Sequence, residues 1–551
     1  MPINNFSKIS LGVGLVDSRA FGYTLLEQSG IPRYLISSIE EGILSGLRLF
    51  FWNHDLDSLN LAIAKYPEVS FAVLTTHDFI GKLYGKPVET HLSFRFSYDQ
   101  NIQYQENSFY LNQNIFTCPG ADIGISYTKT GNEIKDSGML IIEHCNVILI
   151  SFPWDFLNYQ TGGEFGFRPF YSGVLNKNFV EIGPPVDLSK FRRLVINKLI
   201  YASDKLGLPL IAMKHPFLNG KFFSIRIDAD GFHQDAIFEV LKVSNLTGLK
   251  FTWFIDVEGW QNNLNNLKVL KDHQQSIQLH CYEHMTYKSK FLNRVNIRKG
   301  LRYLKKHQVE PIAMVSSNGF YPAGYAEAIK DFSFQYTSEF GYDVDNLPSW
   351  PGNDKHHPLQ IPVHPGSFGV LLPAGFTDIN VFTHLYQTIQ DRISADGLTI
   401  IYEHPFYFLH RTNFWIDFFK GLSNDGYQYI SLSDIAKTWK EHVIRLVNLT
   451  FDIHSGEILT DSLQTVSSLI QLNNVRTAGS HIKVRKQAMS LYPYNFLLID
   501  PKGVQKEIES RQWILRESKI SIPIWFFNYY WNNIKVLIIK SLKKLNLYKK
   551  D

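Results

Sequence analysis

Between residues 221 and about 440 the chain alternates strand-like apolar runs with helix-like segments. Repeated strand–helix units of this kind predict a parallel sheet or a (β/α) barrel. In such folds the polar side chains of a site gather at the carboxyl ends of the strands. Two of the runs, residues 222–227 and 277–279, end in carboxylates and imidazoles respectively. We therefore expect one site where these strands end.

Four side chains in these positions can build a hydrolytic metal site. Asp228 and Asp230 follow the first run, and His280 and His284 follow the second. On a helical turn, histidines four residues apart project from the same side and can bind one ion, with a carboxylate as third ligand. A divalent ion lowers the pKa of its water, and the second carboxylate can accept the water's proton.

A further histidine, His404, follows a strand predicted at residues 398–402. From that place an imidazole can protonate an amine leaving group. The alternative is a loop histidine, since Pro405 favours a turn.

These motifs resemble those of the polysaccharide deacetylases, the NodB-homology fold of carbohydrate esterase family four. Residues 226–231 are similar to the family's strand ending in Thr-Phe-Asp-Asp-Gly, and residues 280–284 match the spacing of its His-Ser/Thr-x-x-His motif. Three later or intervening segments also resemble the family: 251–255, 400–404 and 426–434. The resemblance covers residues 221 to about 440.

The resemblance implies a distorted (β/α) barrel that hydrolyses an N-acyl, acetyl-type group from a sugar. Carried over, it implies Asp228 as the base, His404 as the acid, and Asp230, His280 and His284 as the ligands of a divalent metal. Zinc is the expected ion, with cobalt, manganese and nickel as alternatives.

The sequence departs from the family pattern in two places. Ala229 separates the two aspartates, so the roles of base and ligand can be exchanged between them. Residues 319–324 lack the arginine of the family's Arg-Pro-Pro-Tyr motif, and Tyr321 is the nearest counterpart for a substrate or oxyanion role.

Two other functions compete with the deacetylase. Residues 280–284 also spell His-x-x-Glu-His, the inverted zinc-protease motif, in which Glu283 would be the base on a helix. Alternatively, the missing arginine indicates a degenerate deacetylase fold kept as a binding or scaffold module.

The remaining chain is predicted to flank this barrel. Residues 188–206 have the pattern of an amphipathic helix. Residues 524–551 run from aromatic through aliphatic to lysine-rich, as in an interfacial helix, although packing on its own domain is the alternative. The predicted regions are an N-terminal α/β domain of unknown role (1–150), a connector with a helix (151–220), the barrel (221–440), an accessory β region (441–522) and an amphipathic basic tail helix (523–551).

Composition restricts the class of partner and the compartment. A net charge of +4 over 551 residues does not favour nucleic acid as a partner. Three scattered cysteines fit a reducing compartment, and the first residues do not have a signal-peptide pattern. We expect a cytoplasmic protein, with peripheral contact through residues 524–551 at the inner face of the membrane. Its expected role is envelope-glycan or surface-polysaccharide synthesis on a lipid- or nucleotide-linked carbohydrate.

Overall fold

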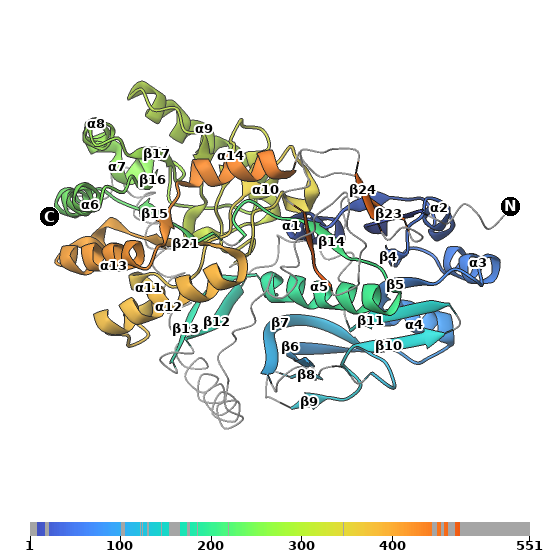
Figure 1. The fold of residues 1–551 in the computed structure, drawn as a ribbon. Coiled ribbons are helices and arrows are strands. Elements are labelled where there is room, and N and C mark those ends of the chain that lie inside the picture. The colour runs from blue at the N-terminus through green and yellow to red at the C-terminus, as the bar shows by residue number, and fades with distance from the viewer. Residues whose placement is uncertain are drawn as a thin grey trace.

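The structure is a computed structural model (Figure 1). It describes residues 8–16, 21–100, 105–121, 123, 125–128, 132–144, 146–153, 166–172, 177–184, 186–218, 220–344, 346–443, 449–452, 457–460 and 469–473.

The N-terminal part of the chain forms a mostly parallel sheet with helices between its strands. Its elements are β2 (Val13–Leu15), α1 (Phe21–Ser29), β3 (Arg33–Leu35), α2 (Ile39–Leu44), β4 (Leu49–Phe51), α3 (Leu56–Lys65), β5 (Phe71–Thr76), α4 (His77–Tyr84), β10 (Leu140–His144) and β11 (Val147–Phe152). The strand order is β10-β11-β5-β4-β2-β3, and only β10 pairs antiparallel. Every residue of β5 and β11 is buried, as expected for central strands of a sheet covered on both faces.

A four-stranded antiparallel sheet is inserted between α4 and β10. It contains β6 (Glu89–Gln100), β7 (Gln105–Thr117), β8 (Ile125–Tyr127) and β9 (Glu133–Ile134), in the order β7-β6-β8-β9. Residues 89–117 contain no glycine or proline to interrupt a strand, and β6 and β7 pair along their length with one register shift between Ser93 and Arg95.

Helix α5 (Leu188–Lys205) lies between the N-terminal sheet and the barrel (Figure 1). It follows the hairpin β12 (Gly166–Ser172) and β13 (Lys177–Gly183), and the Asp187 carboxylate caps it by accepting from the Lys190 amide. Apolar residues of α5 join the core of the N-terminal sheet, whereas Arg192 reaches across to Asp396 at 2.8 Å. The sequence had predicted this helix at residues 188–206.

The central sheet is parallel throughout and curls into an open barrel. Its strands are β15 (Phe222–Ala229), β16 (Thr252–Ile255), β17 (Ser276–Leu279), β18 (Ala313–Met314), β19 (Tyr336–Thr337), β20 (Leu359–Gln360), β21 (Leu398–Glu403) and β22 (Gln428–Tyr429). The order is β20-β19-β18-β17-β16-β15-β21, with β22 also pairing β15. No pairing among the described residues joins β20 to β21. This curled half-barrel is consistent with the distorted (β/α) barrel predicted from the sequence.

Helices connect these strands and bury their apolar faces against the sheet. They are α6 (Gln234–Thr247), α7 (Val257–Trp260), α8 (Leu267–Asp272), α9 (Lys290–Lys306), α10 (Ala323–Ile329), α11 (Phe368–Leu371), α12 (Asp378–Asp396), α13 (Thr412–Asn424) and α14 (Leu432–Val443), with 3-10 turns at η2 (Gln261–Asn266), η3 (Ser317–Gly319), η4 (Pro351–Asn353) and η5 (Pro405–Phe408). Trp253, Trp260, Trp415 and Trp439 are fully buried. Many of the aromatic residues therefore fill cores.

The last described strands return to the N-terminal part of the molecule. β23 (Leu449–Asp452) pairs with β1 (Lys8–Ser10) and with β24 (Glu457–Thr460), and β25 (Leu469–Gln471) pairs with β14 (Ile211–Met213). The predicted tail helix at 523–551 lies outside the described residues, and the domain boundaries remain predictions. Within the part of the chain that the structure describes, no helix has both the length and the apolar character needed to cross a bilayer.

Candidate metal centre

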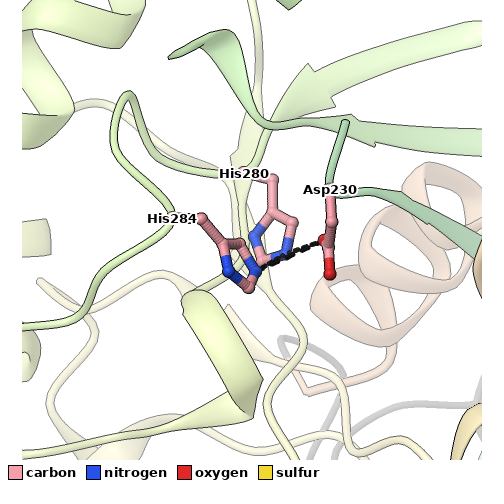
Figure 2. A group of neighbouring side chains, drawn as sticks. All are labelled: Asp230, His280 and His284. Carbon is pink, nitrogen blue, oxygen red and sulfur yellow. Dashed lines mark hydrogen bonds and ion pairs between the residues drawn. The ribbon is translucent and has the colours of Figure 1, made fainter. Parts of the chain in front are cut away.

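Three side chains converge where β15 and β17 end (Figure 2). Asp230 directly follows β15, and its Oδ1 lies 3.1 Å from His280 Nε2 and 3.3 Å from His284 Nε2. The two Nε2 atoms are 3.2 Å from each other. Within the described residues, Asp230, His280 and His284 form a group able to hold a metal ion.

The spacing of these three atoms fits a small divalent cation. Zinc binds imidazole nitrogen at about 2.0–2.1 Å, so neighbouring ligand atoms of a tetrahedral site lie about 3.3 Å apart. The observed separations of 3.1 to 3.3 Å match that value. Two imidazole nitrogens and a carboxylate oxygen at this spacing are the ligand types that such a cation takes in proteins.

A backbone carbonyl fixes the orientation of the His280 ring. His280 Nδ1 is 3.1 Å from the Val315 carbonyl oxygen, which can only accept, so Nδ1 carries the hydrogen. In the neutral ring Nε2 is then the free lone pair, and it faces Asp230. A donor–carbonyl contact of this kind commonly orients a ligating histidine.

The two histidines are not on a helix, contrary to the sequence expectation. Residues 280–284 form a loop after β17 with bends at 282–284, and Cys281 adopts a positive φ of 64°. The Tyr287 hydroxyl donates to the Glu283 carboxylate at 2.6 Å. The inverted zinc-protease motif needs a helix here, so this structure contradicts the protease interpretation.

His404 joins the group from the opposite side of Asp230. It follows β21, and its Nε2 lies 3.3 Å from Asp230 Oδ2. Burial opposes its charging, but the contacts with Asp230 and Glu403 raise the pKa of His404 to about 10. Although burial would raise it, these three histidines hold the pKa of Asp230 well below its ordinary value.

The Glu403 side chain holds the backbone at Phe368 and at His404. This carboxylate is fully buried and accepts from the amides of Phe368 and His404, each at 2.8 Å. Its Oε1 is also 3.6 Å from His404 Nδ1. Sequence reasoning assigned no role to Glu403, although its position at the end of a predicted strand was a usable signal.

Asp228 lies on β15 beside an arginine that the sequence analysis overlooked. The Arg226 guanidinium donates to Asp228 Oδ2 at 2.8 Å, and both side chains are buried. Asp228 Oδ1 makes no hydrogen bond within the described residues. Residues two apart on a strand share a face, so this spacing was a usable signal. An arginine beside the carboxylate is thus present, although residues 319–324 supply none.

A third carboxylate, Asp256, directly follows the neighbouring strand β16 and caps α7. Its Oδ2 accepts from the Gly259 amide at 3.2 Å, and its buried Oδ1 has no partner among the described residues. Burial raises the pKa of Asp256 to about 7. Asp256 follows a strand-like run just as Asp228 and Asp230 do, but sequence reasoning did not select it.

Tyr321 is deeply buried rather than exposed to a substrate. Its ring packs against Tyr325 and Tyr342, with centroids 5.6 and 5.0 Å apart. Burial raises the pKa of its hydroxyl well above the ordinary value. In this conformation the hydroxyl does not face solvent, so a substrate or oxyanion role for Tyr321 remains a prediction.

The chain matches no known protein-family profile and no curated protein. It is similar to several solved structures over about 40% of its length. One of them is a CE4 family pseudoenzyme from Bacillus anthracis, which is 14% identical with a TM-score of 0.29. The match covers 40% of this chain and 66% of the pseudoenzyme chain.

Two further structures are matched over most of their own length. A family 4 acetyl xylan esterase from Clostridium thermocellum in complex with a cobalt ion is 15% identical, with a TM-score of 0.29 and coverage of 39% of this chain and 90% of that one. Puue allantoinase is 15% identical, with a TM-score of 0.36 and coverage of 41% and 93%. These identities and TM-scores are too low to assign chemistry to this chain, so the chemistry of the site rests on its own side chains.

Proposed function

We propose that this protein is a metal-dependent hydrolase that removes an acetyl-type N-acyl group from a carbohydrate. The observation that carries the proposal is the triangle formed by Asp230 Oδ1 and the Nε2 atoms of His280 and His284. These residues would hold a divalent cation, with zinc preferred over cobalt, manganese or nickel. Such an ion, when bound, lowers the pKa of a water and polarises an amide carbonyl.

Two further side chains supply the proton transfers. Asp228 Oδ1 has no hydrogen-bond partner among the described residues, so it can accept a proton from the attacking water, while Oδ2 is held by Arg226. His404 is on the other side of Asp230 and can donate a proton to the leaving nitrogen. The geometry favours Asp230 as ligand and Asp228 as base, rather than the exchanged assignment.

The cellular setting is part of the same proposal. The acyl group would be carried by a lipid- or nucleotide-linked sugar, at the cytoplasmic face of the membrane, in envelope-glycan or surface-polysaccharide synthesis. The support for this setting is the composition of the chain and the basic, aromatic sequence of residues 524–551.

Metal content tests the proposal directly. We expect about one divalent ion per chain in the wild type, measured by elemental mass spectrometry after supply of zinc, and none in H280A/H284A. The matched control is H273A/H356A, which removes two histidines outside the group and should keep the ion. Both double variants should retain the circular-dichroism spectrum of the wild type.

Activity then separates an enzyme from a binding module. On acetylated amino sugars, His404→Ala and Asp228→Asn should each lower kcat by a factor of about 10² to 10⁴, the usual range for a general acid or base, while keeping the metal. If Asp256→Asn rather than Asp228→Asn abolishes turnover, the base has been misassigned. A wild type that stays empty of zinc, cobalt and manganese would refute the hydrolase and leave a carbohydrate-binding or scaffold module.

A further inference from the structure

The exposed apolar side chains of the barrel are unevenly distributed. Among the described residues from 222 to 443, seven large hydrophobic side chains are exposed. Six of them are Phe238, Phe291, Leu292, Val295, Ile379 and Phe406, and we call these six the apolar rim. The seventh, Leu246, is near the C-terminus of α6.

The topology places the apolar rim at the end of the barrel that holds the metal centre. Helices that link parallel strands run antiparallel to them, so they begin where the preceding strand ends. Phe238 lies in the second turn of α6, and three rim residues lie in the first two turns of α9. Phe406 is in η5, two residues after His404.

Ile379 belongs to the same end of the barrel. It is the second residue of α12, whose other end reaches Gly397 immediately before β21 begins. Arg411, which follows η5, pairs with Asp378 at 2.9 Å and so ties the start of α12 to the loop beyond β21. Six apolar side chains therefore surround the end at which the strands of the metal centre terminate.

The charge of α9 indicates what the apolar rim contacts. This helix has seven lysine or arginine residues and no aspartate or glutamate. Its exposed stripe starts with Phe291 and Val295 and continues with Arg298 and Arg302. These two arginines make no ion pair or hydrogen bond with any residue that the structure describes.

The dimensions of this stripe suit a bilayer surface. At 1.5 Å per residue, Arg298 lies about 10 Å along the helix from Phe291. This distance is close to one Debye length at physiological salt, so Arg298 would still be attracted to anionic headgroups when Phe291 enters the acyl boundary. Apolar side chains followed by cations are the pattern of peripheral membrane binding.

We infer that the apolar rim docks the barrel on an anionic lipid bilayer, with the metal centre facing the membrane. This inference deepens the proposed function on which it rests, because it makes the substrate a lipid-linked carbohydrate presented at the bilayer surface. It differs from membrane contact through residues 524–551, since the docking surface belongs to the barrel itself.

Vesicle binding by the full chain tests the inference. The wild type should sediment with vesicles of phosphatidylcholine containing about 30% phosphatidylglycerol, and more weakly with phosphatidylcholine alone. The variant F291S/L292S/V295S should bind at least about tenfold more weakly. R298E/R302E should also weaken vesicle binding. Added salt screens the attraction to anionic lipid, so it should reduce the difference in binding between this variant and the wild type.

A matched variant controls for the loss of exposed apolar surface. L35S/L44S/L61S removes three side chains that are exposed to a similar extent in the N-terminal part, and it should bind vesicles like the wild type. Equal vesicle binding by F291S/L292S/V295S and L35S/L44S/L61S would overturn the inference, and so would an absence of binding by the wild type. Metal content, measured on the same samples, distinguishes failure of the docking surface from failure of the proposed function.

Discussion

At the scale of single residues, the pair Arg226–Asp228 is the most constrained feature near the metal centre. Both side chains are buried, and the guanidinium also lies over the rings of Phe254, Phe340 and Tyr402 at 5.5 to 6.0 Å. A buried carboxylate needs such a partner, because an uncompensated charge in the interior is costly.

Removing Arg226 should therefore lower the free energy of unfolding more than removing an arginine at the surface. We expect Arg226→Met to lower the free energy of unfolding by about 3–5 kcal/mol, and the double variant R226M/D228N to regain part of this loss. Arg411→Met is the control: its pair with Asp378 has a similar length of 2.9 Å but is partly exposed, so about 1 kcal/mol or less is expected. Urea unfolding measures both, and equal losses would show that the buried pair adds little.

At the scale of elements, Gly397 sets the angle between α12 and β21. Its φ is +74°, and a Cβ at this position would lie 1.8 Å from the Phe217 carbonyl oxygen. Gly375 has a similar φ of +81°, but a Cβ there would meet nothing within 4 Å. The two glycines thus share a backbone conformation and differ in the space around them.

Alanine substitutions at these glycines should separate backbone strain from steric clash. Gly375→Ala should cost about 1–2 kcal/mol of stability, the ordinary penalty for a side chain in the left-handed region. Gly397→Ala should cost clearly more, because Phe217 must also move. Thermal unfolding compares them, and matching losses would mean that the chain relaxes around residue 397 without penalty.

The strands and the loops after them show which features could be predicted from the sequence and which could not. Strand–helix alternation located the barrel, and the polar residues after its strands located Asp230, His280, His284 and His404, because periodicity and strand ends are local signals. The helix expected at residues 280–284 was wrong: spacing alone cannot distinguish a helical turn from a bent loop. Asp228 was also selected from the sequence, but its pairing with Arg226 was missed although their spacing on a strand was a signal. The burial that makes this pair important depends on contacts between distant segments.

At the scale of the whole molecule, several histidines are buried away from the metal centre. Burial lowers the pKa of His215 to about 3, and that of His77 and His384 to about 4. An unfolded chain binds these protons near pH 6.5, so the unfolded state binds more protons than the folded state between about pH 6.5 and 4. Through these three histidines, acid in this range therefore favours unfolding.

The contribution of these histidines to stability should consequently fall as the pH drops from 7 to 4, whereas buried carboxyls with a raised pKa, such as Asp256, contribute with the opposite sign. Each such histidine contributes a slope of up to about 1.4 kcal/mol per pH unit. We expect His384→Gln to make the pH dependence of the free energy of unfolding shallower, because it removes one histidine whose pKa is lowered by burial. Chemical unfolding at several pH values measures the slopes, and an unaltered slope for His384→Gln would contradict the assignment.

The pairing of β23 with β1 and of β25 with β14 has a consequence for biosynthesis. During translation β1 leaves the ribosome before the barrel, but β23 emerges only after the entire barrel has been made. Until then the edges of β1 and β14 stay open to pairing with other chains. These pairings can therefore form only after β23 and β25 have been made, and polypeptides released before residue 449 should be recognised by chaperones or aggregate.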